Sequence, residues 1–183
     1  MKQSLRQSII AARQNLAAAD RAACGRAITA RLTALASYRN ASTVLAYMSF
    51  GAEFETAAWV QHALQDNKQV LLPRVNRASK ELDLYRIGGL QRDLAPGAWD
   101  IPEPMPERCS MVEALHDVDF ILLPGVAFTR DGSRLGYGGG FYDKLIARMP
   151  HQPVLVAAAF AMQLVPAISQ EATDRKAEWL VTE

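Results

Sequence analysis

The first 38 residues carry apolar side chains at helical spacing. Within each half of this stretch, the positions recur at intervals of three, four or seven, which places them on one face of a helix. They are Leu5, Ile9, Leu16, Cys24, Ile28, Leu32 and Leu35. The pattern predicts two helices between Lys2 and Tyr38, with Asp20 as the cap at their junction.

Beyond residue 38 the apolar residues gather in short continuous runs, which are typical of buried strands. The predicted strands are residues 43–47, 69–73, 82–87, 119–124, 153–159 and 179–182. Helices are predicted at 60–64 and 141–149, and this alternation indicates an α/β fold with a single domain over residues 1–183. Trp59 and Trp179 lie in apolar elements, so both are predicted to be core residues.

The stretch 88–107 interrupts the pattern of strands and helices. It carries Gly97 among several prolines, and such a composition does not sustain regular structure for long. Long loops in compact domains usually bind ligands or take part in catalysis. We therefore expect this loop, which includes Trp99, to contribute to a functional site.

Composition and charge narrow the choice of partners. The chain has 20 basic and 19 acidic side chains and a formal net charge of +1, so no global field attracts nucleic acid or anionic lipid. Two widely spaced cysteines, Cys24 and Cys109, fit neither a disulfide framework nor a zinc site. With no long apolar run, the sequence predicts a soluble cytoplasmic protein that binds neither membrane nor nucleic acid, and we expect a monomer.

The strongest chemical signal is residues 134–143, RLGYGGGFYD, in which four of ten residues are glycine. Glycines let the backbone approach a ligand and turn its N–H groups toward an anion. Arg134 offers a planar fork for phosphate oxygens, and Asp143 offers a hard oxygen ligand for magnesium. The segment fits neither a Walker A loop nor a dinucleotide fingerprint, so it predicts a phosphate site of another kind, or merely a flexible turn.

Together with the residues before it, this segment resembles the signature of the 5-formyltetrahydrofolate cyclo-ligases, also called methenyltetrahydrofolate synthetases. The resembling sequence is PGVAFTRDGSRLGYGGGFYD at 124–143. Further similar segments follow the same order at 2–6, 50–56, 97–104 and 181–183, together with Asp174. The resemblance implies conversion of 5-formyltetrahydrofolate and ATP to 5,10-methenyltetrahydrofolate, ADP and phosphate, on a three-layer α/β/α sandwich related to sugar-phosphate isomerases and CoA transferases.

The resemblance also implies roles for individual residues. ATP, as co-substrate, would be held by Lys2, Gln3, Ser4, Leu5, Arg6, Arg134, Leu135, Gly136, Tyr137, Gly138, Gly139, Gly140, Phe141 and Tyr142. The folate would contact Arg6, Phe50, Glu55, Tyr137, Gly138, Gly139, Gly140 and Phe141. Arg134 and Tyr142 would take catalytic roles, and Asp143 with Asp174 would bind Mg²⁺.

The segment departs from the family pattern in two respects. Many relatives carry Arg or Lys among the interior glycines and a second Tyr before Tyr142, whereas this chain has Tyr137, Gly139 and Phe141. The resemblance therefore implies that the phosphate charge is met by Lys2 with the two arginines of the predicted site, by magnesium and by backbone amides.

Simpler roles stay open for several of these residues. Lys2 and Arg6 share a helix side that could merely be solvated, and Glu55 could cap the helix that begins near Thr56. Phe50 and Trp99 could stack on a pteridine or simply pack.

The rival to a ligase is a binding module of the sugar-phosphate-isomerase-like class that holds a phosphorylated ligand without consuming ATP. Two carboxylates, Asp143 and Asp174, argue against it, because without a metal they would repel an anionic ligand. A nucleic-acid-binding protein is disfavoured by the balanced charge and the lack of a basic run.

Overall fold

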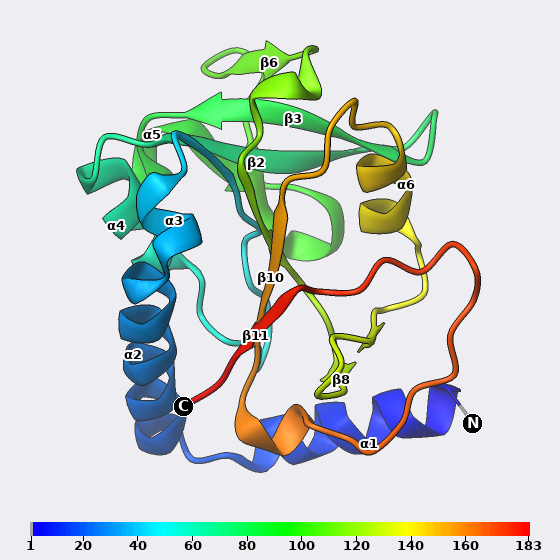
Figure 1. The fold of residues 1–183 in the computed structure, drawn as a ribbon. Coiled ribbons are helices and arrows are strands. Elements are labelled where there is room, and N and C mark those ends of the chain that lie inside the picture. Colours follow the sequence, from blue (N-terminus) through cyan, green and yellow to red (C-terminus); the bar gives the residue numbers. More distant parts are fainter. Residues whose placement is uncertain (1) are drawn as a thin grey trace.

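The computed structural model describes residues 2–183 as helices packed around one large sheet (Figure 1). The helices are α1 (Lys2–Asn15), α2 (Ala18–Ala34), α3 (Ala36–Asn40), α4 (Ala57–Gln65), α5 (Leu90–Asp93) and α6 (Phe141–Ala147), with 3-10 helices η1 (Ala98–Asp100), η2 (Leu115–Asp117) and η3 (Ala161–Gln163). The strands are β1 (Thr43–Leu45), β2 (Gln69–Asn76), β3 (Glu81–Ile87), β4 (Leu94–Pro96), β5 (Pro102–Pro104), β6 (Ser110–Val112), β7 (Phe120–Leu123), β8 (Ala127–Phe128), β9 (Arg134–Leu135), β10 (Val154–Ala158) and β11 (Trp179–Val181).

The large sheet has seven strands in the order β11-β10-β7-β1-β2-β3-β6. The first five are mutually parallel, while β3 and β6 extend the sheet in antiparallel fashion. All four residues of β7, Phe-Ile-Leu-Leu, are buried. A parallel strand covered on both faces favours such a continuous apolar run, which is why this strand is recognisable in the sequence.

Helices cover both faces of the sheet, so the predicted α/β architecture is confirmed. Figure 1 shows α2, α3 and α4 on one side and α6 on the other, with α1 running across the end of the molecule. Tyr38, Trp59 and Phe120 form an aromatic centre beneath the first group, with the Trp59 and Phe120 rings stacked at 5.7 Å between centroids. Trp59 is thus a core residue, as predicted.

Some local predictions were wrong. The stretch predicted as two helices contains three, because Leu35 adopts an extended conformation (φ −61°, ψ 135°) that ends α2 and begins α3. Trp179 is 55% exposed rather than buried, because β11 is the outer strand of the sheet. The stretch 88–107, expected to be a loop, holds a small antiparallel sheet of β4 and β5. Within residues 2–183 no helix combines the length and apolar character needed to cross a membrane.

The hairpin β8–β9 brings the glycine-rich segment beside the C-terminal part of the chain. At its turn, Gly132 adopts φ +85° and its carbonyl accepts a hydrogen bond of 2.9 Å from the N–H of Ala177. A Cβ atom on Gly132 would lie 1.9 Å from the Ala177 carbonyl oxygen. The turn is further held by Lys176, which forms an ion pair with Asp131. This contact fixes the segment that carries Asp174.

We expect Gly132→Ala to lower the free energy of unfolding by about 2–4 kcal/mol, because both the positive φ and the approach to Ala177 exclude a side chain. The melting temperature should therefore fall by at least about 5 °C. Gly25→Ala is the matched control, since Gly25 lies within α2 and has no atom within 4 Å of the position that an added Cβ would take. There, the gain in helix propensity should raise the melting temperature by about 2 °C. Equal melting temperatures for the two variants would contradict the assignment of strain to Gly132.

Candidate active site

A cavity of about 1040 Å³ opens beyond the carboxyl ends of β1 and β7. Tyr47 and Met48 follow β1 and Pro124 follows β7, and all three line the cavity. Ligands of α/β proteins commonly bind at this edge of the sheet. The volume lies at the upper end of the range typical of small-molecule sites, so the cavity has room for more than one ligand.

Residues 134–143, here called the glycine segment, all line this cavity. Gly138 and Gly140 adopt φ values of +105° and +63°, which side-chain-bearing residues rarely take. The Nε atom of Arg6 donates a hydrogen bond of 2.7 Å to the carbonyl oxygen of Gly136. The segment is thus a shaped wall of the cavity rather than only a flexible turn.

One side of the cavity carries a set of paired charges, which we call the charged cluster: Lys2, Arg134, Asp143, Glu171 and Asp174. Lys2 Nζ lies 2.9 Å from a Glu171 oxygen and 4.0 Å from Asp174 Oδ2, and Arg134 donates to Asp143 Oδ1 at 2.7 Å. The backbone N–H of residue 175 also donates to Asp143 Oδ1, at 2.8 Å. Asp143 therefore lies beside the chain segment that carries Asp174.

Two buried polar atoms at this side have no hydrogen-bond partner among residues 2–183: the Tyr142 hydroxyl and Arg134 Nε. Both residues line the cavity. Burial raises the pKa of Tyr142, with Arg134 opposing the rise, so the hydroxyl keeps its proton at neutral pH and can donate it to a ligand. Unsatisfied buried groups are costly, and an anion whose oxygens reached these two atoms would satisfy them.

Asp143 and Asp174 fit magnesium by their chemistry. The hydrogen bonds to the Asp143 side chain both use Oδ1, and the one to Asp174 uses Oδ2. Each carboxylate therefore keeps an oxygen for a hard cation. Among residues 2–183, no group of three or more His, Cys, Asp or Glu side chains gathers for a metal. Two carboxylates suit an ion whose other ligands are phosphate oxygens and water.

A second part of the cavity wall, here called the aromatic side, carries the rings of Phe50, Trp99, Tyr137 and Phe141. The Phe50 and Tyr137 rings lie 5.1 Å apart between centroids, and Trp99 meets the edge of Phe141 at 6.4 Å. Trp99 is 68% exposed and, like Asp100, adopts a positive φ. Flat, accessible rings at a cavity wall favour a planar heterocyclic ligand.

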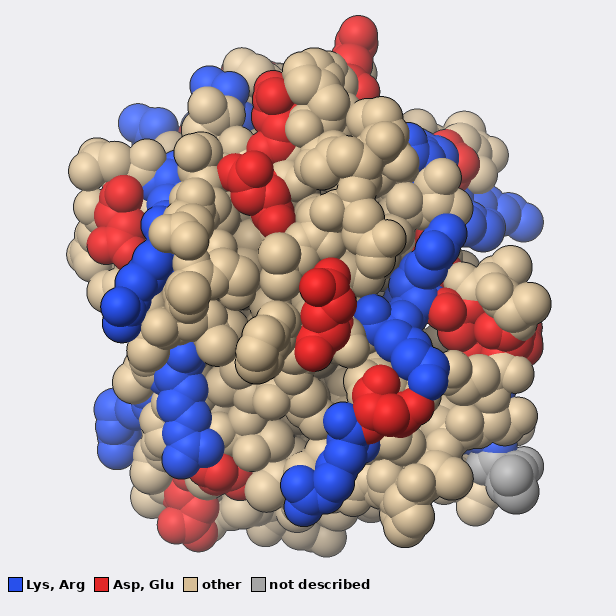
Figure 2. Space-filling view, in the orientation of Figure 1, with Lys and Arg blue, Asp and Glu red and all other residues tan. Residues whose placement is uncertain are grey.

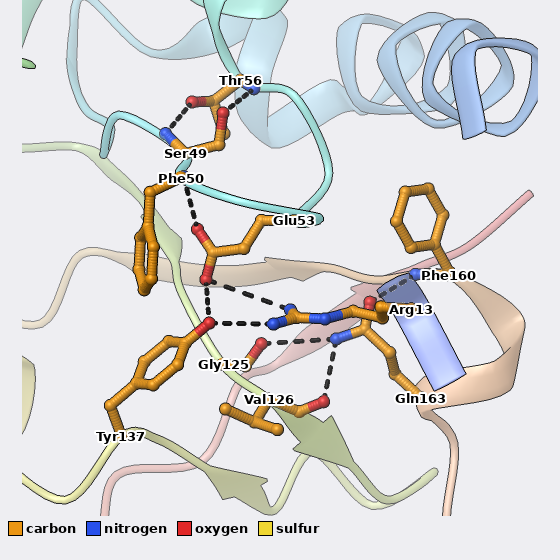
Figure 3. A network of polar contacts seen from close by, with 10 residues as sticks. All are labelled: Arg13, Ser49, Phe50, Glu53, Thr56, Gly125, Val126, Tyr137, Phe160 and Gln163. Carbon is orange, nitrogen blue, oxygen red and sulfur yellow. Dashed lines mark hydrogen bonds and ion pairs between the residues drawn. The ribbon is translucent and has the colours of Figure 1, made fainter. Parts of the chain in front are cut away.

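A buried carboxylate, Glu53, lies at this aromatic side. Its side chain accepts a hydrogen bond of 2.6 Å from the Tyr137 hydroxyl and one of 3.2 Å from the N–H of Phe50 (Figure 3). Arg13 Nη2 donates to the Tyr137 hydroxyl at 2.9 Å. Burial raises the pKa of Glu53, while the hydrogen bonds from Tyr137 and Phe50 and the charge of Arg13 oppose that rise.

Most residues expected at the site do line the cavity. They are Lys2, Arg6, Phe50, Asp143 and Asp174, with every residue of the glycine segment. The structure does not bring Gln3, Ser4, Leu5 or Glu55 to the cavity wall. Leu5 instead packs in a small apolar cluster with Ile9, and Glu55 is exposed, whereas Glu53 and Phe54 before it are buried.

Two residues of the site were missed in the sequence. Glu53 lines the cavity where Glu55 was expected, and Arg13 supports it from α1. A signal for Arg13 existed, because Lys2, Arg6 and Arg13 are separated by four and seven positions and so share one helix face. Nothing in the sequence distinguishes Glu53 from Glu55, since both lie in the same irregular segment.

Charges outside the cavity are mixed in sign. Figure 2 shows basic and acidic side chains interspersed over one face of the molecule, without a large area of either sign. Among the residues that line the cavity, five are basic and five are acidic. Recognition of a charged ligand must therefore rest on particular side chains rather than on the overall field.

The whole chain matches a known enzyme family. Residues 1–183 match the model of the 5-formyltetrahydrofolate cyclo-ligase family. The chain is 30% identical over 190 residues to the 5-formyltetrahydrofolate cyclo-ligase of Mus musculus, which covers 100% of this chain and 93% of that protein. Identity to the enzyme of the same description from Haemophilus influenzae is 29% over 174 residues, covering 94% and 92%.

Two solved structures share the fold. The NMR structure of the Aquifex aeolicus 5,10-methenyltetrahydrofolate synthetase superposes with a TM-score of 0.84 at 30% identity, covering 98% of this chain and 88% of that chain. The Mycoplasma pneumoniae 5,10-methenyltetrahydrofolate synthetase superposes with a TM-score of 0.78 at 18% identity, covering 99% and 98%. At that lower identity, the second match supports the fold alone.

The raised pKa of Glu53 generates a prediction about stability. A carboxyl whose folded-state pKa lies above its unfolded value binds more protons in the folded state, so it lowers stability as pH rises through and above the ordinary glutamate range. We therefore expect the melting temperature of Glu53→Gln minus that of the wild type to increase as the pH rises from about 4 to about 7. Differential scanning calorimetry over this range measures the difference. A difference that moves the other way would mean that Arg13 and Tyr137 outweigh the cost of burial.

Proposed function

Because the chain belongs to the 5-formyltetrahydrofolate cyclo-ligase family, we propose that its cavity binds magnesium-ATP and 5-formyltetrahydrofolate on the two sides of the glycine segment. The activity of this family, which we assign to the chain, is ATP-dependent conversion of 5-formyltetrahydrofolate to 5,10-methenyltetrahydrofolate. One observation carries the arrangement: the charged cluster and the aromatic side share a single cavity and a single backbone wall.

We assign the triphosphate to the charged cluster. Lys2 and Arg134 supply positive charge, and the glycine backbone permits close approach. The unpaired Tyr142 hydroxyl and Arg134 Nε are donors that phosphate oxygens would satisfy. Asp143 and Asp174 would hold magnesium by their remaining oxygens, and the bound ion would neutralise charge on the transferred phosphoryl group.

We assign the pterin to the aromatic side. Phe50, Tyr137 and Trp99 offer faces and edges for a flat ring, and Glu53 offers acceptor oxygens. The amino and N–H groups on the pyrimidine edge of a pterin are donors, which match a carboxylate. Arg6 lines the same cavity and is hydrogen-bonded to Gly136, so its remaining guanidinium donors are available to either ligand.

The chemistry explains why the two ligands must lie together. A formyl group on N5 is an amide, and its oxygen leaves poorly. The formyl oxygen attacks the γ-phosphorus and ADP departs; N10 then attacks the formyl carbon, loses its proton and closes the ring as phosphate leaves with that oxygen. Phosphoryl transfer requires positioning and neutralisation of charge more than covalent catalysis. In this proposal Arg134 and Tyr142 donate to the phosphoryl oxygens, and no nucleophilic side chain is needed.

The rival, a passive binder of phosphorylated ligands, is set aside. The chain matches the cyclo-ligase family over its full length, which would not be expected of a protein that only binds phosphorylated ligands. Its site would also have no use for the two carboxylates of the charged cluster.

We expect the purified protein to form the methenyl product only when ATP, 5-formyltetrahydrofolate and a divalent cation are all present. Product formation is followed by its absorbance, with a chelator and a non-hydrolysable ATP analogue as controls. Asp143→Asn and Asp174→Asn should each lower turnover at least tenfold, or about 1.4 kcal/mol, and higher magnesium should partly restore it.

The two effects should not multiply in the double variant, because both residues serve one ion. Glu178→Gln is a suitable control, since Glu178 is an exposed acid of the same C-terminal stretch and does not line the cavity. If Asp174→Asn matches the wild type at every magnesium concentration, Asp174 is not a ligand. Full turnover in the chelator would refute the metal requirement itself.

Glu53 and Glu55 form a matched pair for the folate side. Glu53→Gln should raise the KM for 5-formyltetrahydrofolate about tenfold and leave the KM for ATP within twofold, because an amide offers the pterin edge only one acceptor oxygen. Glu55→Gln should change both KM values by less than twofold. Steady-state kinetics on the two variants decides between them, and the reverse pattern would return the folate contact to Glu55, where the resemblance first implied it.

A further inference from the structure

We propose that Arg13 is a positioning residue of the folate side, which fixes the Tyr137 hydroxyl and the Glu53 carboxylate so that Glu53 presents acceptor oxygens to the pterin. The inference rests on the proposed function, because it assigns a role within the site that we give to the folate. Arg13 does not line the cavity and is 3% exposed, so it acts through these two residues rather than on the ligand.

The three side chains form a closed set of contacts, drawn in Figure 3. Arg13 Nη2 donates to the Tyr137 hydroxyl at 2.9 Å, and that hydroxyl donates to Glu53 Oε1 at 2.6 Å. Arg13 Nη1 lies 3.9 Å from the same Glu53 oxygen. The side chains of Arg13 and Glu53 are each 4% exposed, so these two charges are shielded from solvent, whereas Tyr137, which links them, is 43% exposed.

The donor and acceptor inventory fixes the direction of these hydrogen bonds. A guanidinium has only donors, so the Tyr137 hydroxyl must accept from Arg13. The single hydroxyl hydrogen of Tyr137 is then donated to Glu53, where Oε1 accepts it. Glu53 Oε2 accepts in turn from the N–H of Phe50. Both carboxylate oxygens are thereby set as acceptors, and each keeps a lone pair for a ligand donor.

Removing the guanidinium would release this constraint. The Tyr137 hydroxyl could then rotate, and the buried Glu53 would lose its nearest positive charge. A buried carboxylate without a positive partner tends to take up a proton, and a protonated carboxyl would present a donor to the donor edge of the pterin. The mismatch would weaken binding of the folate and leave the charged cluster unaffected.

Helix α1 is held firmly enough to give Arg13 this role. Ile9, one turn before Arg13, packs with Val126 and Leu135 of the β8–β9 region in a buried cluster. Gln163 of η3 donates to the carbonyl oxygens of Gly125 and Val126, and so fixes the strand beneath α1 (Figure 3). A buried arginine on an anchored helix has few alternative positions.

A role limited to anchoring α1 is the competing explanation, and binding measurements separate the two. We expect Arg13→Gln to weaken binding of 5-formyltetrahydrofolate, measured by calorimetry without nucleotide, about tenfold, and to leave the Kd of magnesium-ATP within twofold. Arg13→Lys, which restores the charge, should recover part of the loss. Tyr137→Phe, which keeps the ring and removes the link, should reproduce the effect of Arg13→Gln. Arg26→Gln, an exposed arginine of α2, is the matched control and should change neither affinity.

A double-mutant cycle with Glu53→Gln completes the test. If Arg13 acts through Glu53, Arg13→Gln should weaken folate binding less than twofold further once Glu53 is glutamine. A lower melting temperature with unchanged folate affinity, or independent multiplicative losses, would overturn the proposal and leave Arg13 as an anchor. Should Arg13→Gln fail to fold, Arg13→Lys and Tyr137→Phe decide by the same criteria. Failure of the wild type to bind 5-formyltetrahydrofolate would instead refute the proposed function.

Discussion

The glycine segment depends on helix α1 for its shape. With four glycines in ten residues, the segment has few side chains with which to hold itself, and its backbone takes positive φ values at Gly138 and Gly140. Arg6 holds its Gly136 carbonyl and Arg13 holds the Tyr137 hydroxyl, both from one face of α1. A segment whose glycines allow many backbone conformations thus takes its shape from contacts with a separate and more rigid element, helix α1.

The parts of the structure that follow local patterns were predictable from the sequence. The parallel strands β7 and β10 are buried on both faces, so their apolar runs stood out, and the glycine segment was distinctive enough to locate the cavity. The choice between Glu53 and Glu55 was not predictable. Both lie in an irregular segment without periodicity, and what distinguishes Glu53 is its tertiary contacts with the Tyr137 hydroxyl and with Arg13, which lie far from it in the sequence. The prediction that Trp179 is a core residue was wrong for a similar reason, because the position of its strand at the edge of the sheet depends on tertiary structure.

The residues of the charged cluster form ion pairs with one another, and these ion pairs differ in their exposure to solvent. Lys2 and Glu171 meet with side-chain exposures of 30% and 72%, a setting in which an ion pair contributes little and exchanges partners readily. Arg134 and Asp143 are only 7% and 17% exposed, so their contact is less screened by solvent. Of the two cations in the charged cluster, Lys2 is therefore the one that can more readily change partners when a ligand binds, whereas Arg134 and Asp143 are better suited to stay in place.

The two sides of the cavity differ in whether their buried polar groups already have hydrogen-bond partners within the protein. At the charged cluster, Arg134 Nε and the nearby Tyr142 hydroxyl have no hydrogen-bond partner among residues 2–183, which suits a ligand that brings many acceptor oxygens. The folate side instead satisfies its carboxylate internally through Tyr137 and Phe50, so that only the acceptor lone pairs remain for a neutral heterocycle. An uncompensated Glu53 would bind a proton or a cation before it bound a pterin, because burial already raises its pKa. The guanidinium of Arg13, placed behind Tyr137 and out of the cavity, supplies the compensating charge without competing for the ligand.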